Sequence, residues 1–183
     1  MSHSSSLFVC SFSLLEEGQN ILSSSGNHTI AVVKGPEDYS TLSDGLKNVI
    51  DAVNTLIDDG CLYIDGKRVN LHFHLGGDYK FLLLAMGMKG ATSNNSCIWC
   101  LIHKNDRCKM SVGSTHYNSD GMKRHFGPRW HKDPGCEHQP LFKIALEDIV
   151  IDELHLMLRV TDRLEKGIIF EVIDWDEVRI MKK

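Results

Sequence analysis

The sequence predicts an α/β fold in which helices flank a mixed sheet and one long irregular segment interrupts the regular structure. Short β-branched runs in the first half are typical of strands, and two stretches carry apolar residues at helical spacing. Between residues 89 and 139 both patterns are lost, and glycine, asparagine, serine, histidine and basic residues dominate. The chain has 183 residues, of which 42% are hydrophobic and 24% charged, which is enough for one domain with a core.

The first elements are expected to be two strands and a helix. Residues 7–12 place apolar side chains on alternate positions, which predicts a strand with one buried face. Residues 29–33 are continuously apolar and β-branched, which predicts a central strand. A helix should follow, with Ser43 or Asp44 as its N-cap and Gly60 at its end, because apolar residues recur there every three or four positions.

An Asp-Gly pair at residues 65–66 predicts the turn of a β-hairpin, whose strands would be residues 62–64 and 69–75. In the second strand His72 and His74 share the face opposite the apolar one. These two histidines could chelate a metal ion together. The solvent-exposed face of a hairpin is the simpler interpretation, because polar side chains alternate with apolar ones along the strand.

Asp78 follows directly after this strand, where Gly76 and Gly77 let the chain turn away. Its first interpretation is structural: it can cap a helix that begins at Tyr79 or Lys80 and contains the apolar residues 81–88. Its second is chemical, because ligands gather at the ends of sheet strands and a carboxylate there can hold Mg²⁺ beside a phosphate. The two interpretations are compatible.

Regular structure is expected again after Pro140. Asp152 is a suitable N-cap for a helix that Gly167 would end, and residues 168–173 could form a last strand. His155 lies in the first turn of this helix. The simpler interpretation there is a core histidine whose ring nitrogens have hydrogen-bond partners, and the alternative is a metal ligand.

Cys97 and Cys100 form a C-x-x-C pair, which is the clearest candidate for a metal site. Two thiolates at this spacing can bind one zinc ion from a tight turn. His103 and Cys108 would complete a C-x2-C-x2-H-x4-C pattern similar to a zinc knuckle, although the gap before the histidine is shorter than in that family. A zinc ion would also explain how the irregular insertion at residues 89–139 is held together.

Two alternatives to this ligand set remain open. Cys136 and His138, at the far end of the insertion, could supply the third and fourth ligands instead. The C-x-x-C pair could also be two buried thiols in a loop, without any metal.

Charge is concentrated in the same region. Between His103 and Lys132 seven Lys and Arg residues stand against two acidic residues, so this segment carries a net charge of +5 and the remainder −9, given −4 for the whole chain. Such a segment is a candidate phosphate-binding face, and Tyr117, Phe126 and Trp130 within it could stack on bases. A solvated loop is the alternative interpretation.

Several classes of protein find no support in the sequence. It contains no phosphate-binding P-loop, no serine-esterase motif and no H-E-x-x-H metalloprotease motif. It has no apolar stretch long enough for a membrane span and no positively charged start typical of a signal peptide. Its six cysteines are unevenly spaced, which favours a reduced intracellular protein with a metal site over a disulfide scaffold.

Three segments in this order resemble a known family. Residues 73–80 (FHLGGDYK), 96–100 (SCIWC) and 151–155 (IDELH) are similar to the RNase H-like catalytic core of DDE transposases, including the catalytic subunit of the V(D)J recombinase and related transposon-derived proteins. The resemblance covers roughly residues 7 to 165. It implies an α/β RNase H-like fold with a mixed sheet, in which residues 1–183 form a single partial domain and residues 89–139 a zinc-supported insertion.

The resemblance also implies a chemistry, in which three carboxylates hold two Mg²⁺ ions that act on DNA phosphodiesters. Asp78 matches one catalytic carboxylate, and Cys97 and Cys100 match zinc ligands. The other two carboxylates have no match here, so we expect a remnant or fragment of a nuclease core, truncated at both ends and inactive as it stands. DNA is the expected partner and the nucleus the expected location, with self-association left open and no membrane partner.

A second function from a different class is compatible with the same residues. The chain could be a zinc-stabilised module that binds DNA or protein and has no catalytic activity. In this alternative Cys97 and Cys100 keep their structural role, and Asp78 acts only as a helix cap.

Overall fold

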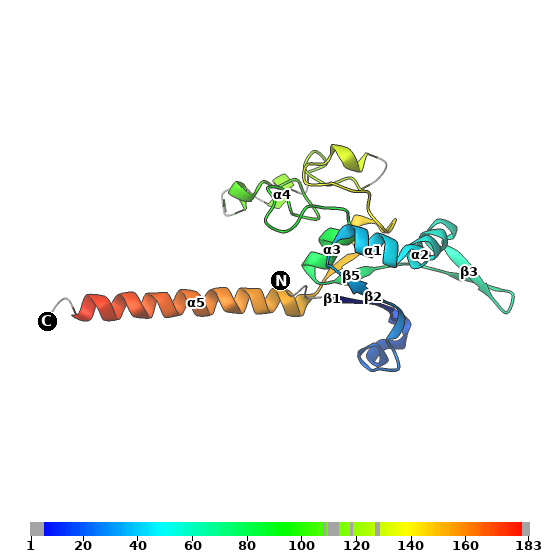
Figure 1. Cartoon of the computed structure of the whole chain (residues 1–183), viewed down its shortest axis with the longest axis horizontal. Helices are drawn as coiled ribbons and strands as arrows, with labels where there is room; N and C mark the ends of the chain where they lie inside the picture. The colour runs from blue at the N-terminus through cyan, green and yellow to red at the C-terminus, as the bar shows by residue number, and fades with distance from the viewer. Residues whose placement is uncertain (1–5, 108, 110–113, 118, 127–128, 181–183) are drawn as a thin grey trace.

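The computed structural model describes residues 6–107, 109, 114–117, 119–126 and 129–180. It confirms the mixed α/β class. Among these residues, however, the strands form three separate two-stranded sheets instead of one mixed sheet. The sheets and short helices make up a central body, and one long helix, α5, extends away from it (Figure 1).

The first sheet pairs β1 (Ser6–Phe12) antiparallel with β2 (His28–Gly35), and the 3-10 helix η1 (Leu15–Leu22) lies between them. The predicted strand is confirmed, and its inward face is confirmed in part: Phe8 and Cys10 pack against the core, whereas Phe12 is 48% exposed. The predicted central position of residues 29–33 is wrong. In the described structure β2 has β1 as its one partner, so Val32 is left 59% exposed.

Two consecutive helices, α1 (Tyr39–Gly45) and α2 (Lys47–Asp59), cover the core with Leu42, Leu46 and Ile50. The first helix begins earlier than predicted, because the Asp38 side chain caps it by accepting a hydrogen bond from the Thr41 amide at 2.8 Å. The predicted end is confirmed. Gly60 has a φ of 63° in the left-handed region, which closes α2.

The hairpin of β3 (Cys61–Ile64) and β4 (Lys67–Asn70) is confirmed, with its turn at Asp65 and Gly66, whose φ angles are 49° and 73°. Its second strand is much shorter than predicted. β4 ends at Asn70, and residues 71–74 belong to no strand. His72 and His74 therefore lie on a connection and do not form the face of a hairpin.

The next strand, β5 (Leu75–Gly77), pairs in parallel with β6 (Ile149–Ile151), which is far away in sequence. The register joins Leu75 to Ile149, and both side chains are buried in the core. Because β5 and β6 are parallel, their carboxyl ends meet at one edge of this small sheet and their amino ends at the other.

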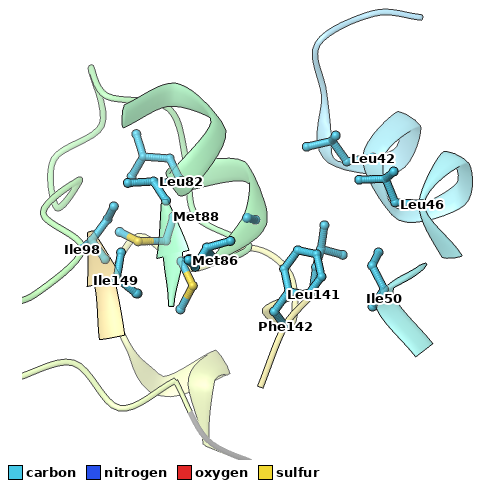
Figure 2. Close-up of a cluster of buried hydrophobic side chains, with 13 residues drawn as sticks. Leu42, Leu46, Ile50, Leu82, Met86, Met88, Ile98, Leu141, Phe142 and Ile149 are labelled. Atoms are coloured by element: carbon cyan, nitrogen blue, oxygen red, sulfur yellow. The ribbon is translucent and has the colours of Figure 1, made fainter. Parts of the chain in front are cut away.

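Helix α3 (Tyr79–Ala85) follows β5 and supplies the centre of the core with Leu82 and Leu83, which are 0% and 1% exposed. Figure 2 shows this cluster. The side chains from α1 and α2 face Leu141 and Phe142, while those from α3 lie beside Ile98 and Ile149. The core thus joins elements from the whole chain up to β6.

The insertion is irregular, as predicted, in its described part. It contains only the short helices η2 (Lys104–Asp106), α4 (Ser114–Tyr117) and η3 (Trp130–Lys132), and a further short helix, η4 (Leu146–Asp148), precedes β6. Two isolated β-bridges, Met88 with Cys136 and Cys100 with Lys123, connect the ends and the middle of the insertion.

The end of the chain corrects two predictions. Helix α5 runs from Glu153 to Ile180, so Gly167 does not end it and residues 168–173 are helical instead of a strand. Apolar residues on α5 remain uncovered, with Ile168 63% and Phe170 65% exposed. No described strand lies beside them, so helix propensity decides the local structure where sheet pairing is absent.

Gly167 provides a direct test of this continuous helix. A Cβ added at residue 167 would meet no atom within 4 Å, and glycine in a helix interior is about 1 kcal/mol less favourable than alanine. Gly167→Ala should therefore raise the helix content of α5 and its amide-exchange protection on both sides of residue 167. If Gly167 instead closed the helix in a left-handed conformation, alanine would lower both quantities.

Candidate functional site

Two acidic residues follow the two strands of the β5–β6 sheet at its carboxyl edge. Asp78 follows β5 directly and Asp152 follows β6, one residue beyond the last register pair of Gly77 and Ile151. Neighbouring strands in a sheet are ~4.8 Å apart. The parallel pairing therefore brings two acidic residues that are remote in sequence to the edge where α/β proteins bind their ligands.

Both carboxylates also cap the helices that follow them. One oxygen of Asp78 accepts a hydrogen bond from the Phe81 amide at 2.8 Å, which confirms the predicted N-cap of α3. One oxygen of Asp152 accepts from the Leu154 amide at 2.9 Å. Because a carboxylate has two oxygens that each accept, the cap through one oxygen of Asp78 is compatible with a cation at its other oxygen.

The sequence analysis does not predict that Asp152 and Asp78 follow adjacent strands of one sheet. Residues 149–151 were not recognised as a strand, although they are a β-branched run of Ile, Val and Ile. That run, followed at once by an acidic residue as in β5, is the signal that could have found it.

Tyr79 connects this edge to the cysteine loop. Its hydroxyl donates to the Ser96 carbonyl at 2.6 Å. Burial, with a smaller effect of the neighbouring Cys97, raises the pKa of Tyr79 to about 12, so the hydroxyl keeps its proton and remains a donor at neutral pH. The loop that carries Cys97 and Cys100 is thereby held against the first turn of α3.

The two cysteines have a geometry that suits a metal ion. The Sγ atoms of Cys97 and Cys100 are 3.4 Å apart, and two thiolates on a tetrahedral zinc ion are separated by about 3.8 Å at ordinary Zn–S distances. Burial raises the pKa of the Cys100 thiol, so zinc would have to displace a proton when it binds. The pair therefore fits half of a zinc site.

The structure does not bring the other predicted ligands to this pair. Among the described residues, no third His, Cys, Asp or Glu joins Cys97 and Cys100 in a group of metal-binding size. The His103 ring instead accepts a hydrogen bond from the Asn105 amide at 3.3 Å and caps η2. Cys108 lies outside the described residues, so its predicted role stays a prediction.

The alternative ligands at the end of the insertion lie in different surroundings. The Cys136 thiol is 3.8 Å from a guanidinium nitrogen of Arg124, which also donates to the Cys97 carbonyl. The His138 ring stacks on Tyr39 with a centroid distance of 4.2 Å. Of these two alternatives, Cys136 is therefore connected to the cysteine pair, because Arg124 contacts both the Cys136 thiol and the Cys97 carbonyl. The side chain of His155 lies outside the described residues.

Arg124 holds the insertion together from inside. It is 3% exposed, and its guanidinium donates to the carbonyls of Asn95, Cys97 and Pro134 at 2.5, 2.5 and 2.8 Å. Three backbone acceptors from both ends of the insertion thus satisfy one buried cation. Of the seven basic residues predicted for phosphate binding, this one has a structural role.

The remaining basic residues of the segment are exposed. Lys109 pairs with Asp106 at 2.7 Å, and Arg107 donates to the Ser96 hydroxyl at 2.7 Å. The exposed residues beyond these two are Lys104, Lys123, Arg129 and Lys132.

The three aromatic residues of the segment differ in what they can contact. Phe126 packs against the core, which removes it as a base-stacking residue. Tyr117 and Trp130 are partly exposed, and each makes a T-shaped ring contact with the adjacent histidine. These two aromatic side chains and the exposed basic residues are the part of the insertion that could contact a nucleic acid.

The structure contains a second group of potential metal ligands, of which the sequence analysis predicts His72 and His74 but not the third. His72 and His74 lie beside Asp148, which precedes β6, and the ligand atoms of the three side chains are within 4.8 Å of one another. Asp148 was not singled out from the sequence. Its neighbours in space depend on the β5–β6 pairing, which local patterns do not reveal.

Comparison with known proteins adds no relative to this picture. No family model, curated protein or solved structure matches the chain. No helix in the described part of the chain is long and apolar enough to cross a membrane.

Replacing the cysteine pair tests the zinc half-site. Cobalt bound by thiolates absorbs in the near ultraviolet through sulfur-to-metal charge transfer, and the wild-type chain should show this band and lose it when zinc is added. Cys97→Ser/Cys100→Ser should abolish the band and remove about one zinc equivalent per chain. Cys10→Ser/Cys61→Ser, a matched pair outside the insertion, should keep both. A band that survives in the Cys97→Ser/Cys100→Ser variant would contradict the assignment.

Proposed function

We propose that this chain is part of an RNase H-like nuclease core of the DDE transposase and recombinase type, and that it binds DNA at the carboxyl edge of β5 and β6. The observation that carries the proposal is the position of Asp78 and Asp152 at adjacent ends of two parallel strands. Paired carboxylates at such an edge are the usual protein ligands of Mg²⁺ next to a substrate phosphate.

Asp78 is the carboxylate that the sequence resemblance matches to a catalytic position, and Asp152 follows the strand that pairs with β5. When bound, Mg²⁺ would polarise a phosphate and activate the attacking oxygen. Asp78 and Asp152 would bind and orient that ion while their other oxygens hold the helix ends. With one matched catalytic carboxylate of three, we expect this chain on its own to bind DNA without cutting it.

The insertion would add affinity for the DNA backbone. Its exposed basic residues lie on a segment that zinc at Cys97 and Cys100 would stabilise together with Arg124. Contacts of Lys and Arg to phosphate release counterions, so this part of the binding should weaken with salt. A protein with this role would act in the nucleus, as the resemblance implies.

A specific observation also favours a second function. Asp78 already serves as a helix cap, and the cysteine pair has zinc-like spacing without any need for catalysis. The chain could therefore be a zinc-stabilised binding module for DNA or protein. The two functions differ in whether Mg²⁺ at Asp78 contributes to DNA binding.

Asp78→Asn separates the two functions, because asparagine caps helices as well as aspartate does but carries no charge. We expect Mg²⁺ to tighten binding of a short DNA duplex by the wild-type chain, and Asp78→Asn to lose about tenfold of affinity in Mg²⁺, or ~1.4 kcal/mol. Fluorescence anisotropy with and without Mg²⁺ measures this, and thermal unfolding checks that the fold is kept.

The matched control is Asp38→Asn. Asp38 caps α1 through a hydrogen bond of 2.8 Å from the Thr41 amide, as Asp78 caps α3, but it does not follow a strand of the β5–β6 sheet. The Asp38→Asn variant should keep the gain in DNA affinity that Mg²⁺ gives the wild-type chain. Equal Mg²⁺ dependence of both variants would contradict the nuclease-core proposal and favour the binding module, and absence of any DNA binding would contradict both DNA functions.

A further inference from the structure

Three side chains meet at the amino edge of the β5–β6 sheet. The Nε2 atom of His72 is 2.7 Å from one carboxylate oxygen of Asp148, and the Nδ1 atom of His74 is 3.5 Å from the same oxygen. The two imidazole rings stack with a centroid distance of 4.7 Å and an angle of 24° between their planes. Two ring nitrogens and one carboxylate thus converge on one point.

The backbone explains this convergence. His74 precedes β5 and Asp148 precedes β6, one residue before the first register pair of Leu75 and Ile149. His72 lies two positions earlier, and both histidines are exposed, while the alternate residues Leu71 and Phe73 are partly buried. The alternation of an extended chain therefore directs both imidazoles to the side of the carboxylate.

We propose that His72, His74 and Asp148 form a binding site for a divalent first-row transition metal, with Zn²⁺ as the ion that fits best. Two imidazole nitrogens and one carboxylate oxygen are a ligand set that zinc accepts, whereas Mg²⁺ and Ca²⁺ favour oxygen ligands alone. Ligand atoms around a tetrahedral zinc ion are about 3.3 Å apart at ordinary bond lengths. The separations of 2.7 and 3.5 Å bracket that value.

The charge around Asp148 supports a cation at this site. Lys143 lines the same hollow of about 200 Å³ as Asp148, but its ammonium group pairs with Asp58. In the part of the chain that the structure describes, the two histidines are the ion-pair partners of Asp148. A metal ion held by the two imidazole nitrogens would place a positive charge directly beside the Asp148 carboxylate.

The site would also leave room for a further ligand. Three protein ligands occupy three positions of a tetrahedral zinc ion, and a water molecule or an anionic ligand takes the fourth. The His72 side chain is 69% exposed and that of His74 39%, so the fourth position faces solvent. The neighbouring hollow has an apolar wall that includes Ile57, Leu71 and Ile144.

This metal site is independent of the proposed function. It lies at the amino ends of β5 and β6, whereas Asp78 and Asp152 lie at their carboxyl ends. It is also separate from the thiolate pair, because it contains no sulfur ligand. The loss of one site therefore leaves the other two testable.

Zinc titration of the purified full chain by isothermal calorimetry tests the proposal. The wild-type chain should bind a further zinc ion besides the one assigned to the thiolates. His72→Gln/His74→Gln should weaken this binding by at least about tenfold, which corresponds to ~1.4 kcal/mol. Asp148→Asn should weaken it too, because the amide that replaces the carboxylate carries no charge.

The matched control is His28→Gln/His131→Gln, which removes two exposed histidines from elsewhere in the chain and should leave the titration unchanged. The cobalt–thiolate band provides the check of folding, and it should persist in His72→Gln/His74→Gln. Unchanged zinc binding in that variant would overturn the site. Full zinc binding by Asp148→Asn would overturn the three-ligand assignment.

Discussion

The parallel pairing of β5 with β6 is the constraint on which the rest of the structure depends. It is a short ladder with few hydrogen bonds, yet Leu75 and Ile149, its first register pair, are both buried in the core. A shift of one residue in either strand would turn its apolar side chains away from the core. Burial thus selects a single register, and that register determines what meets at each edge of the sheet.

One register therefore accounts for both groups of ligands outside the insertion. At the carboxyl edge Asp78 and Asp152 follow the last paired residues of adjacent strands, and at the amino edge His74 lies beside Asp148. The distance of 3.5 Å from His74 to Asp148 shows that the neighbour relation continues beyond the last paired residue at one end. The proposed Mg²⁺ and Zn²⁺ sites are, in this account, two consequences of one pairing.

The insertion is stabilised differently, by polar contacts instead of a periodic apolar face. An unpaired guanidinium would be costly to bury, but the three carbonyls around Arg124 satisfy it and tie both ends of the segment together. Ile98 is 0% exposed and anchors the cysteine loop in the core. A zinc ion at Cys97 and Cys100 would further stabilise an insertion that Arg124 and Ile98 already hold in place.

Local signals in the sequence predicted local structure well. The turn at residues 65–66, the end of α2 at Gly60 and the cap at Asp78 each depend on a few adjacent residues, and all three are confirmed. Two local predictions are wrong, the N-cap at Ser43 or Asp44 and the helix end at Gly167, and the other errors concern pairing over long distances. The sequence analysis predicts no strand at β6 and a possible one at residues 168–173, because a β-branched run has no local feature that shows whether a partner strand exists. Asp148 was missed for the same reason.

Nuclear magnetic resonance of the labelled chain would test the β5–β6 register most directly. The account predicts cross-strand nuclear Overhauser effects between Gly76 and Val150, together with slow amide exchange in both strands. Contacts of Gly76 with a different segment, or a register displaced by one residue, would contradict it. Either result would separate Asp78 from Asp152 and His74 from Asp148, and both proposed metal sites would lose their structural basis.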